Sequence, residues 1–173
     1  MGSAILPCPG RGDLIRDENT MKLPLTGGCQ CGQLRYEVNA EPLSVYVCHC
    51  TECQRQSGAA FGMSVLVPRA AFRFVKGVPR RYSRTADSGR VIDGDFCETC
   101  GVRPVHYPRA NDKVAILKPG TLDDTSWLHP VGHIWTKSAQ AWMPIAEDSV
   151  TMEGHPDDLT PLIEAWSRYR QNL

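Results

Sequence analysis

Seven of the eight cysteines fall into three tight groups, and this pattern constrains the chain more than any other feature. The groups are, in chain order, Cys29 and Cys31 (C-x-C), Cys48, Cys50 and Cys53 (C-x-C-x-x-C), and Cys97 and Cys100 (C-x-x-C). Paired cysteines at these spacings are typical of metal sites in proteins whose thiols stay reduced. Structural zinc takes four protein ligands, whereas catalytic zinc takes three and keeps one exchangeable position. The spacing therefore predicts two zinc ions per chain, divided four plus three.

The two outer pairs lie in "GGCQCG" and "FCETCG", where glycines flank the thiols. Glycine permits the tight turns that aim several sulfurs at one ion. A four-cysteine site formed by Cys29, Cys31, Cys97 and Cys100 would join the start of the domain to its middle and contribute to folding. The alternative is that these residues are reduced thiols in the core.

The central trio, in "CHCTEC", leaves one position on its metal for water, substrate or another side chain. His49 and Glu52 lie inside the motif and are candidates for that position or for hydrogen bonds to the ligands. The alternative is a closed site completed by a fourth protein ligand such as Cys8. Three thiolates give bound zinc a net negative charge, which favours a soft sulfur ligand. Thiol substrates therefore fit the site better than hydrolysis does.

The 173 residues carry 19 acidic and 19 basic side chains, which gives no electrostatic basis for binding nucleic acid. The apolar runs are too short to span a membrane, and no signal peptide is recognisable. We expect a cytoplasmic protein with a flexible extension over residues 1–20 and a single zinc-binding domain over 21–173. Its oligomeric state is not predicted.

Period-two alternation predicts a mainly β fold of short antiparallel strands organised around the zinc sites. The expected strands cover residues 33–38, 43–47, 60–68, 71–75, 80–84, 90–96, 102–107, 113–118 and 132–136. A short helix is expected over 51–58, ending at Gly58. A C-terminal helix is expected from Thr160, as the N-cap, through Pro161 at the first helical position, with Leu162, Ile163, Trp166 and Tyr169 or Arg170 on one side.

Together the motifs resemble the family of glutathione-dependent formaldehyde-activating enzymes, which includes centromere protein V. The matching pieces are "GGCQCGQLRYEV", "CHCTECQRQSGAAF", the Phe72 to Gly77 spacing, "FCETCG", "GTLDD" and "HIWTKSAQAW". The resemblance implies a two-zinc β fold in which the outer pairs hold a structural zinc and the trio holds a catalytic one.

The resemblance also implies a carbon–sulfur lyase that joins glutathione to formaldehyde, so the expected partner is a small thiol or its aldehyde adduct. The chain departs from the family pattern at Gln54 and Asp95, where arginine is common, and at 102–104, where "VRP" replaces small and apolar residues. The residues that bind the substrate are not predicted. Two other functions stay open: a non-catalytic zinc module that binds another protein, and a thiol-redox or metal-responsive protein.

Several further residues could belong to a site. His133, Trp135 and Trp142 could wall a substrate pocket, although core packing is the favoured interpretation of the tryptophans. Asp123 and Asp124 could be acid–base groups or turn residues. His106, His129 and His155 have no partner at a motif spacing and are interpreted as surface or core residues.

Overall fold

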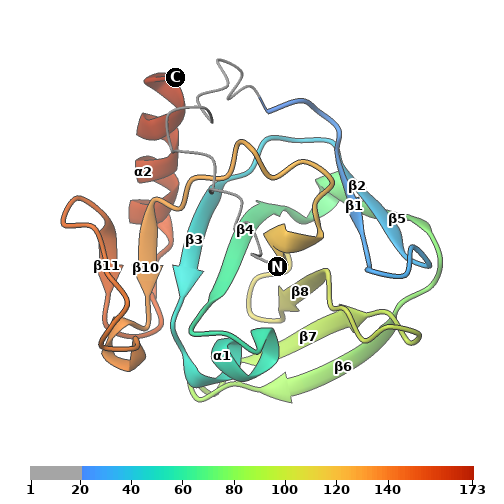
Figure 1. Cartoon of the computed structure of the whole chain (residues 1–173), viewed down its shortest axis with the longest axis horizontal. Helices are drawn as coiled ribbons and strands as arrows, with labels where there is room; N and C mark the ends of the chain where they lie inside the picture. Colours follow the sequence, from blue (N-terminus) through green and yellow to red (C-terminus); the bar gives the residue numbers. More distant parts are fainter. Residues whose placement is uncertain (1–20) are drawn as a thin grey trace, which may run out of the picture.

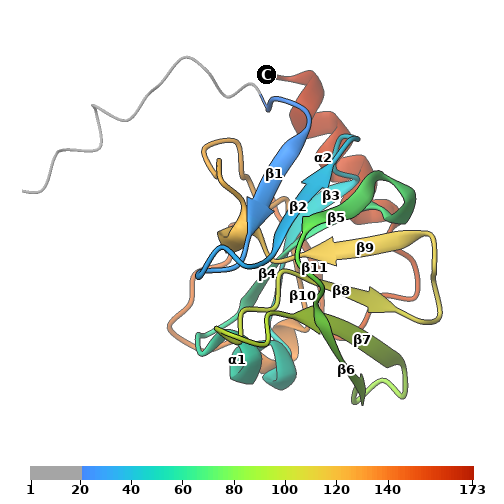
Figure 2. The ribbon, with the colours of Figure 1, turned by 90° about the vertical axis from the view of Figure 1, so that its right-hand side faces the viewer.

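The computed structural model describes residues 21–173, so the expected extension over 1–20 and the cysteine at position 8 lie outside the described residues. The fold is mainly β with a helix at the C-terminus, as predicted. It contains an eight-stranded sheet and a three-stranded sheet (Figures 1 and 2).

The large sheet has the strand order β11-β10-β3-β4-β9-β8-β7-β6. Its strands are β3 (Ser44–Cys48), β4 (Gly62–Pro68), β6 (Arg80–Thr85), β7 (Val91–Phe96), β8 (Val105–Pro108), β9 (Val114–Leu117), β10 (Gly132–Ile134) and β11 (Val150–Met152). Neighbours pair antiparallel except for β10, which is parallel to both β3 and β11. The small sheet, β1-β2-β5, consists of β1 (Leu25–Gly28), β2 (Arg35–Val38) and β5 (Phe72–Lys76).

The register of the large sheet sorts its side chains onto two faces. Side chains alternate along each strand, so residues paired across strands share a face. One face carries Val45, Val65 and Leu117 into the main core, which the small sheet covers with Tyr36 and Phe72. The opposite face carries Tyr46, Cys48, Leu66, Ile116 and Ile134 into a second cluster. The expected catalytic cysteines therefore begin at the end of a buried strand, on the face away from the small sheet.

Two α-helices are present among the described residues. Helix α2 (Thr160–Gln171) lies along β3 and buries Leu162 and Trp166, two of the residues predicted for its inner side (Figure 1). Helix α1 (Thr51–Ser57) follows β3 directly and ends at Gly58 in the left-handed conformation, as expected. Three short 3₁₀ turns complete the fold: η2 (Arg69–Ala71), η3 (Pro119–Thr121) and η4 (Thr136–Ser138).

The start of α2 differs from the prediction by one residue. Thr160 is the first helical residue and Leu159 is the N-cap, without a side-chain cap bond. Instead, the Asp158 carboxylate accepts hydrogen bonds from both the backbone N–H and the hydroxyl of Thr160, at 2.8 and 2.7 Å. The carboxylate before the helix takes the place that the sequence pattern assigned to the threonine hydroxyl.

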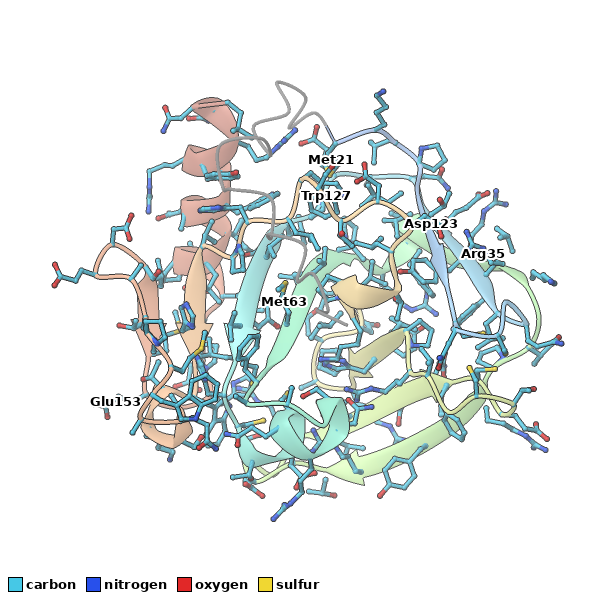
Figure 3. All side chains as sticks on the ribbon, viewed as in Figure 1. Met21, Arg35, Met63, Asp123, Trp127 and Glu153 are labelled. Atoms are coloured by element: carbon cyan, nitrogen blue, oxygen red, sulfur yellow. The ribbon has the colours of Figure 1, made fainter. Side chains whose placement is uncertain are left out.

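Contacts between β2 and the loop after β9 tie the small sheet to the large one. Arg35 and Asp123 point toward each other and form an ion pair, visible in Figure 3. The Tyr36 and Thr121 hydroxyls are 2.8 Å apart. Asp123 also accepts a hydrogen bond from Thr26, while Asp124 accepts bonds from Ser126 within a turn. These contacts give both aspartates a structural role: Asp123 links the two sheets and Asp124 stabilises a turn.

Candidate functional site

The four outer cysteines converge from two turns. Cys29 and Cys31 lie in the loop between β1 and β2, and Cys97 and Cys100 lie in the loop between β7 and β8, where Gly101 has a positive φ. Their sulfurs all lie within 4.8 Å of one another. The Cys31 sulfur is 3.5 Å from that of Cys29 and 3.6 Å from that of Cys97.

These spacings fit zinc better than disulfides. Four sulfurs at about 2.3 Å from one ion, on tetrahedral corners, lie roughly 3.8 Å apart, whereas a disulfide bond is about 2.05 Å long. The Leu34 N–H donates to the Cys29 sulfur at 3.2 Å. Although burial opposes ionisation, this bond and the neighbouring thiols lower the pKa of Cys29 to about 6. Although a backbone hydrogen bond from Gln33 opposes it, the contacts with the other three thiols raise the pKa of Cys31 to about 12, so the cluster keeps a shared proton unless a cation replaces it. The positions of the four sulfurs therefore show a cluster that could hold a metal ion.

The trio forms because β3 ends where α1 begins. Cys48 is the last residue of β3 and is buried, Cys50 is the N-cap of α1, and Cys53 lies one turn into the helix. The Cys50 sulfur accepts a hydrogen bond from the Cys53 N–H at 3.3 Å, which is an N-cap contact made by a thiol. All three sulfurs lie within 4.8 Å of one another.

The trio shares its protons unequally when no cation holds the sulfurs. Hydrogen bonds from Cys48 and Cys50 lower the pKa of Cys53, while the contacts with Cys50 and Cys53, together with burial, raise that of Cys48. One of the three thiols therefore carries the charge. A metal that displaces the protons would relieve the crowding of sulfurs, so the donor set suits a thiophilic cation.

The two candidate residues within "CHCTEC", His49 and Glu52, differ in their surroundings. His49 is fully buried, with its Nε2 2.9 Å from Nδ1 of His133 and the two rings stacked. His49 is not among the residues that line the cavity at the trio, whereas Glu52 is. The Glu52 carboxylate pairs with Arg55 at 2.7 Å and approaches Arg84 at 3.7 Å.

The backbone of His49 helps to hold the trio segment. Its carbonyl accepts hydrogen bonds from Gln54 Nε2 at 2.7 Å and from the Ser138 hydroxyl at 3.0 Å. Gln54, which stands where the family commonly has arginine, therefore ties α1 to the η4 turn. Its amide oxygen also accepts a bond from Gln140.

A small cavity of about 90 Å³ opens at the trio. Its walls come from seven strands of the large sheet, from α1 and from loops far apart in the sequence. Besides the three cysteines they include Tyr46, Ser64, Arg84, His106, Ile134, Trp135 and His155. The sequence patterns missed His106 and His155, because neither lies near a cysteine motif.

His106 is one of the residues that line this cavity. Its Nδ1 is buried and has no hydrogen-bond partner among residues 21–173. Burial, with Lys118, Arg103 and Arg84 nearby, lowers the pKa of His106 well below its usual value, so the imidazole is neutral at neutral pH. A neutral imidazole can accept or donate one proton at a bound molecule.

Lys118 and Arg103 lie beside Cys53 with few counter-charges. A Cβ added to Gly62 would lie 3.5 Å from the Cys53 sulfur and 3.6 Å from Lys118 Nζ, so both atoms border the same space. Lys118 Nζ and Arg103 Nε are buried without a hydrogen-bond partner in the described part of the chain. Burial lowers the pKa of Arg103 to about 10, and Cys53 opposes that shift. Arg103 therefore stays charged at neutral pH.

The late tryptophans do not pack as the favoured interpretation expected. Trp142 is 70% exposed, which contradicts a place in the core. Trp135 is half-buried and lines the trio cavity while touching the second cluster. It adopts φ 60° and ψ 39°, a left-handed conformation that costs a bulky residue about 1–3 kcal/mol. Strain of this kind at a cavity wall indicates a functional constraint.

A family model described as glutathione-dependent formaldehyde-activating enzyme matches residues 24–138, more than half of the chain. The chain belongs to this family. A crystal structure of a Rhodobacter sphaeroides protein is also similar, with 24% sequence identity and a TM-score of 0.47, over 58% of this chain and 89% of that one.

Membership supports a glutathione-dependent formaldehyde-activating or related function, and it suggests enzymatic activity. The matched range contains both cysteine clusters, each of which could hold a metal ion. No helix within residues 21–173 combines the length and the apolar character needed to cross a membrane.

Proposed function

We propose that this chain is a zinc-dependent carbon–sulfur lyase that acts on the adduct of a small thiol with an aldehyde, in the manner of an S-hydroxymethylglutathione synthase. The observation that carries the proposal is the convergence of three cysteine sulfurs on a cavity that non-ligand polar groups also line. A purely structural zinc site has no need of such a cavity. In this proposal the four-cysteine cluster holds a second, structural zinc.

The reaction adds a thiol to formaldehyde. The S–H bond breaks, a C–S bond forms at the carbonyl carbon, and the carbonyl oxygen gains a proton to become a hydroxyl. The reverse reaction returns the proton to sulfur. Zinc held by Cys48, Cys50 and Cys53 would have one open position, which would either bind the sulfur as thiolate or polarise the carbonyl oxygen.

We assign the relay of the proton from sulfur to oxygen to His106, whose neutral ring lines the cavity and has an unpartnered Nδ1. Because burial and the neighbouring cations disfavour the imidazolium, the ring passes the proton on to the oxygen instead of holding it. Tyr46 and Ser64 border the same cavity and offer hydroxyls to the oxygen. Trp135 and Ile134 form an apolar wall that limits water around the adduct.

The cations beside Cys53 set the charge of the centre. Zinc with three thiolates carries one negative charge, which would repel an incoming thiolate. Lys118 and Arg103 offset that charge from the side of Cys53. The site can therefore accept an anionic sulfur that an isolated three-thiolate zinc would disfavour.

NMR exchange spectroscopy tests the proposal by following adduct formation from formaldehyde and a series of small thiols, glutathione included. We expect acceleration over the uncatalysed background. Cys50→Ser should abolish it, and His106→Gln should reduce it without loss of metal. Asp124→Asn, in an exposed turn outside the cavity, serves as the control. No acceleration with any thiol would contradict the proposal and favour a non-catalytic zinc module.

A further inference from the structure

The cavity at the trio is too small to hold a whole substrate. Its volume of about 90 Å³ equals the share of roughly three water molecules in the liquid. Sites for small molecules usually measure about 300–1,000 Å³. The cavity can take the reacting sulfur and one carbon, so the rest of the molecule must lie in adjoining space.

A groove of about 410 Å³ continues from the cavity, between α1 and strands β6 and β7. The two spaces share Glu52, Arg84 and Ile92 as lining residues, so they adjoin each other. In Figure 1, α1 lies at the same end of the molecule as β6 and β7. A molecule whose sulfur reaches the trio can therefore extend along this groove.

One side of the groove is apolar. Tyr82 pairs across the sheet with Gly94, and Arg84 pairs with Ile92, so these four residues share a face. Phe96 lies two residues beyond Gly94 on that face. Tyr82 is 64% exposed although it is an aromatic residue in a strand. A tyrosine, an isoleucine and a phenylalanine around a groove offer a surface for a flat apolar group.

The same groove also carries two cationic side chains, of which Arg84 lies on the strand face just described. Arg103 lies over Gly94, where an added Cβ would come within 2.8 Å of its Cδ, so the arginine occupies the space that a larger residue at position 94 would need. No ion pair links Arg103 to a carboxylate in the described part of the chain, and its Nε is unpartnered. Arg84 has only the 3.7 Å approach to Glu52, which Arg55 already pairs at 2.7 Å. Cys53 is the acidic group beside Arg103, but neither guanidinium is closely paired with a carboxylate, which favours an anionic ligand.

We propose that this groove is a specificity subsite for the non-reacting part of the substrate, and that the substrate is a thiol with an aromatic or apolar body and a carboxylate. The body lies against Tyr82, Ile92 and Phe96, and the carboxylate binds Arg103 and Arg84. The inference rests on the proposed function of the trio. It defines a substrate less polar than the tripeptide named by the family.

A second space competes for the same role. A wider cleft of about 840 Å³ also reaches Cys53 and Arg103, and its walls include Gln56, Thr121 and Thr125. Of the three trio cysteines it touches Cys53 alone, whereas the small cavity touches all three. The groove itself touches none of them, but it shares three lining residues with the small cavity, whereas the wider cleft shares only Cys53 with it. On this ground we assign the substrate body to the groove.

Calorimetry on the zinc-loaded protein tests the inference with 4-mercaptophenylacetate, its neutral methyl ester and glutathione. The acid and its ester share the same thiol and ring, so the ratio of their affinities measures what the carboxylate contributes to binding. We expect the acid to bind about tenfold more tightly than the ester, as one charge-assisted contact gives. Arg103→Met keeps the aliphatic stem over Gly94 and should bring the ratio near one. The control is Arg80→Met, on β6, where the arginine pairs with Glu98 and does not line the groove. This substitution should preserve the ratio of the two affinities.

Tyr82→Ala changes an exposed side chain and should weaken both ligands without unfolding the protein. Amide NMR shifts should change at Gly94 and Gly101 on addition of phenylacetate, which has no sulfur. Three results would contradict the assignment of the groove without affecting the proposed function of the trio. They are equal binding of acid and ester, an unchanged ratio of the two affinities in Arg103→Met, and shift changes at Gly120 and Thr125 instead of Gly94 and Gly101. Failure of every thiol to bind, glutathione included, would overturn the proposed function and the groove with it.

Discussion

Cys97→Ser should destabilise the protein far more than Cys50→Ser does. The four-cysteine cluster joins Cys31 to Cys97 across 66 residues of chain, so a metal there removes much of the freedom of the unfolded state. The loop-closure relation gives about 4 kcal/mol for a cross-link of that length. This is a large part of the roughly 5–15 kcal/mol that stabilises a typical domain.

The trio closes only a short loop, and the hydrogen bonds of β3 and α1 already fix that loop. Serine is itself a favoured N-cap residue, so Cys50→Ser should keep the contact with the Cys53 N–H. Through the lost metal ligand alone, it should lower the free energy of unfolding by much less than the roughly 4 kcal/mol expected for Cys97→Ser. Equilibrium urea unfolding of both variants, monitored by circular dichroism with zinc present, measures the difference.

Adding a chelator to the wild type gives the matched control. Chelated wild type and Cys97→Ser should have similar midpoints of unfolding, because both lack the metal ion that links the β1–β2 loop to the β7–β8 loop. The reasoning would be refuted if the two cysteine variants lost the same stability, or if chelation left the wild-type midpoint unchanged.

Three further predictions concern the backbone, pH and the N-terminal region. Trp135→Gly should be more stable than Trp135→Ala by about 1 kcal/mol in thermal melts, because only glycine relieves the positive φ; the usual order, alanine above glycine, would contradict the strain. Arg109 holds the pKa of Asp93 below its usual value, so this ion pair stabilises the fold above about pH 4. The wild type should therefore be more stable than Asp93→Asn at neutral pH, and this difference in the free energy of unfolding should vanish as pH falls through the native pKa of Asp93. A difference that persisted at pH 2 would contradict the prediction. A chain that starts at Met21 should keep both metals by elemental analysis, whereas loss of one metal would show that Cys8 completes the second site.

The sequence predicted the parts of the structure that depend on local chemistry. The cysteine spacings anticipated both clusters, because the trio lies within six residues and the two outer pairs each supply two ligands toward a complete set of four. Gly58 marked the end of α1, since a left-handed residue stops a helix. Alternation located most of the strands, but the three-residue strand β11 and the parallel pairing of β10 depend on tertiary contacts.

The groove and the cations could not be found in the same way. Arg84, Arg103, His106 and Lys118 come from three segments in or next to the large sheet and meet only because of its strand order. None of the four belongs to a motif that assigns it a role, although Arg103 and Lys118 lie close to the motifs "FCETCG" and "GTLDD". The departure at 102–104 was a signal, because it placed an arginine where the family has small residues, but its meaning depends on Gly94 in the neighbouring strand.

The central claim is that the trio forms an open three-sulfur metal centre beside a closed four-sulfur one. X-ray absorption at the zinc edge measures the mean number of sulfur ligands per zinc in the full chain. Four sulfurs at one cluster and three at the other average to about 3.5 across two zinc ions. The account predicts that value for the protein alone, with a rise to about 4 when a thiol substrate is added. A mean of 4 without thiol, or one zinc per chain, would contradict it.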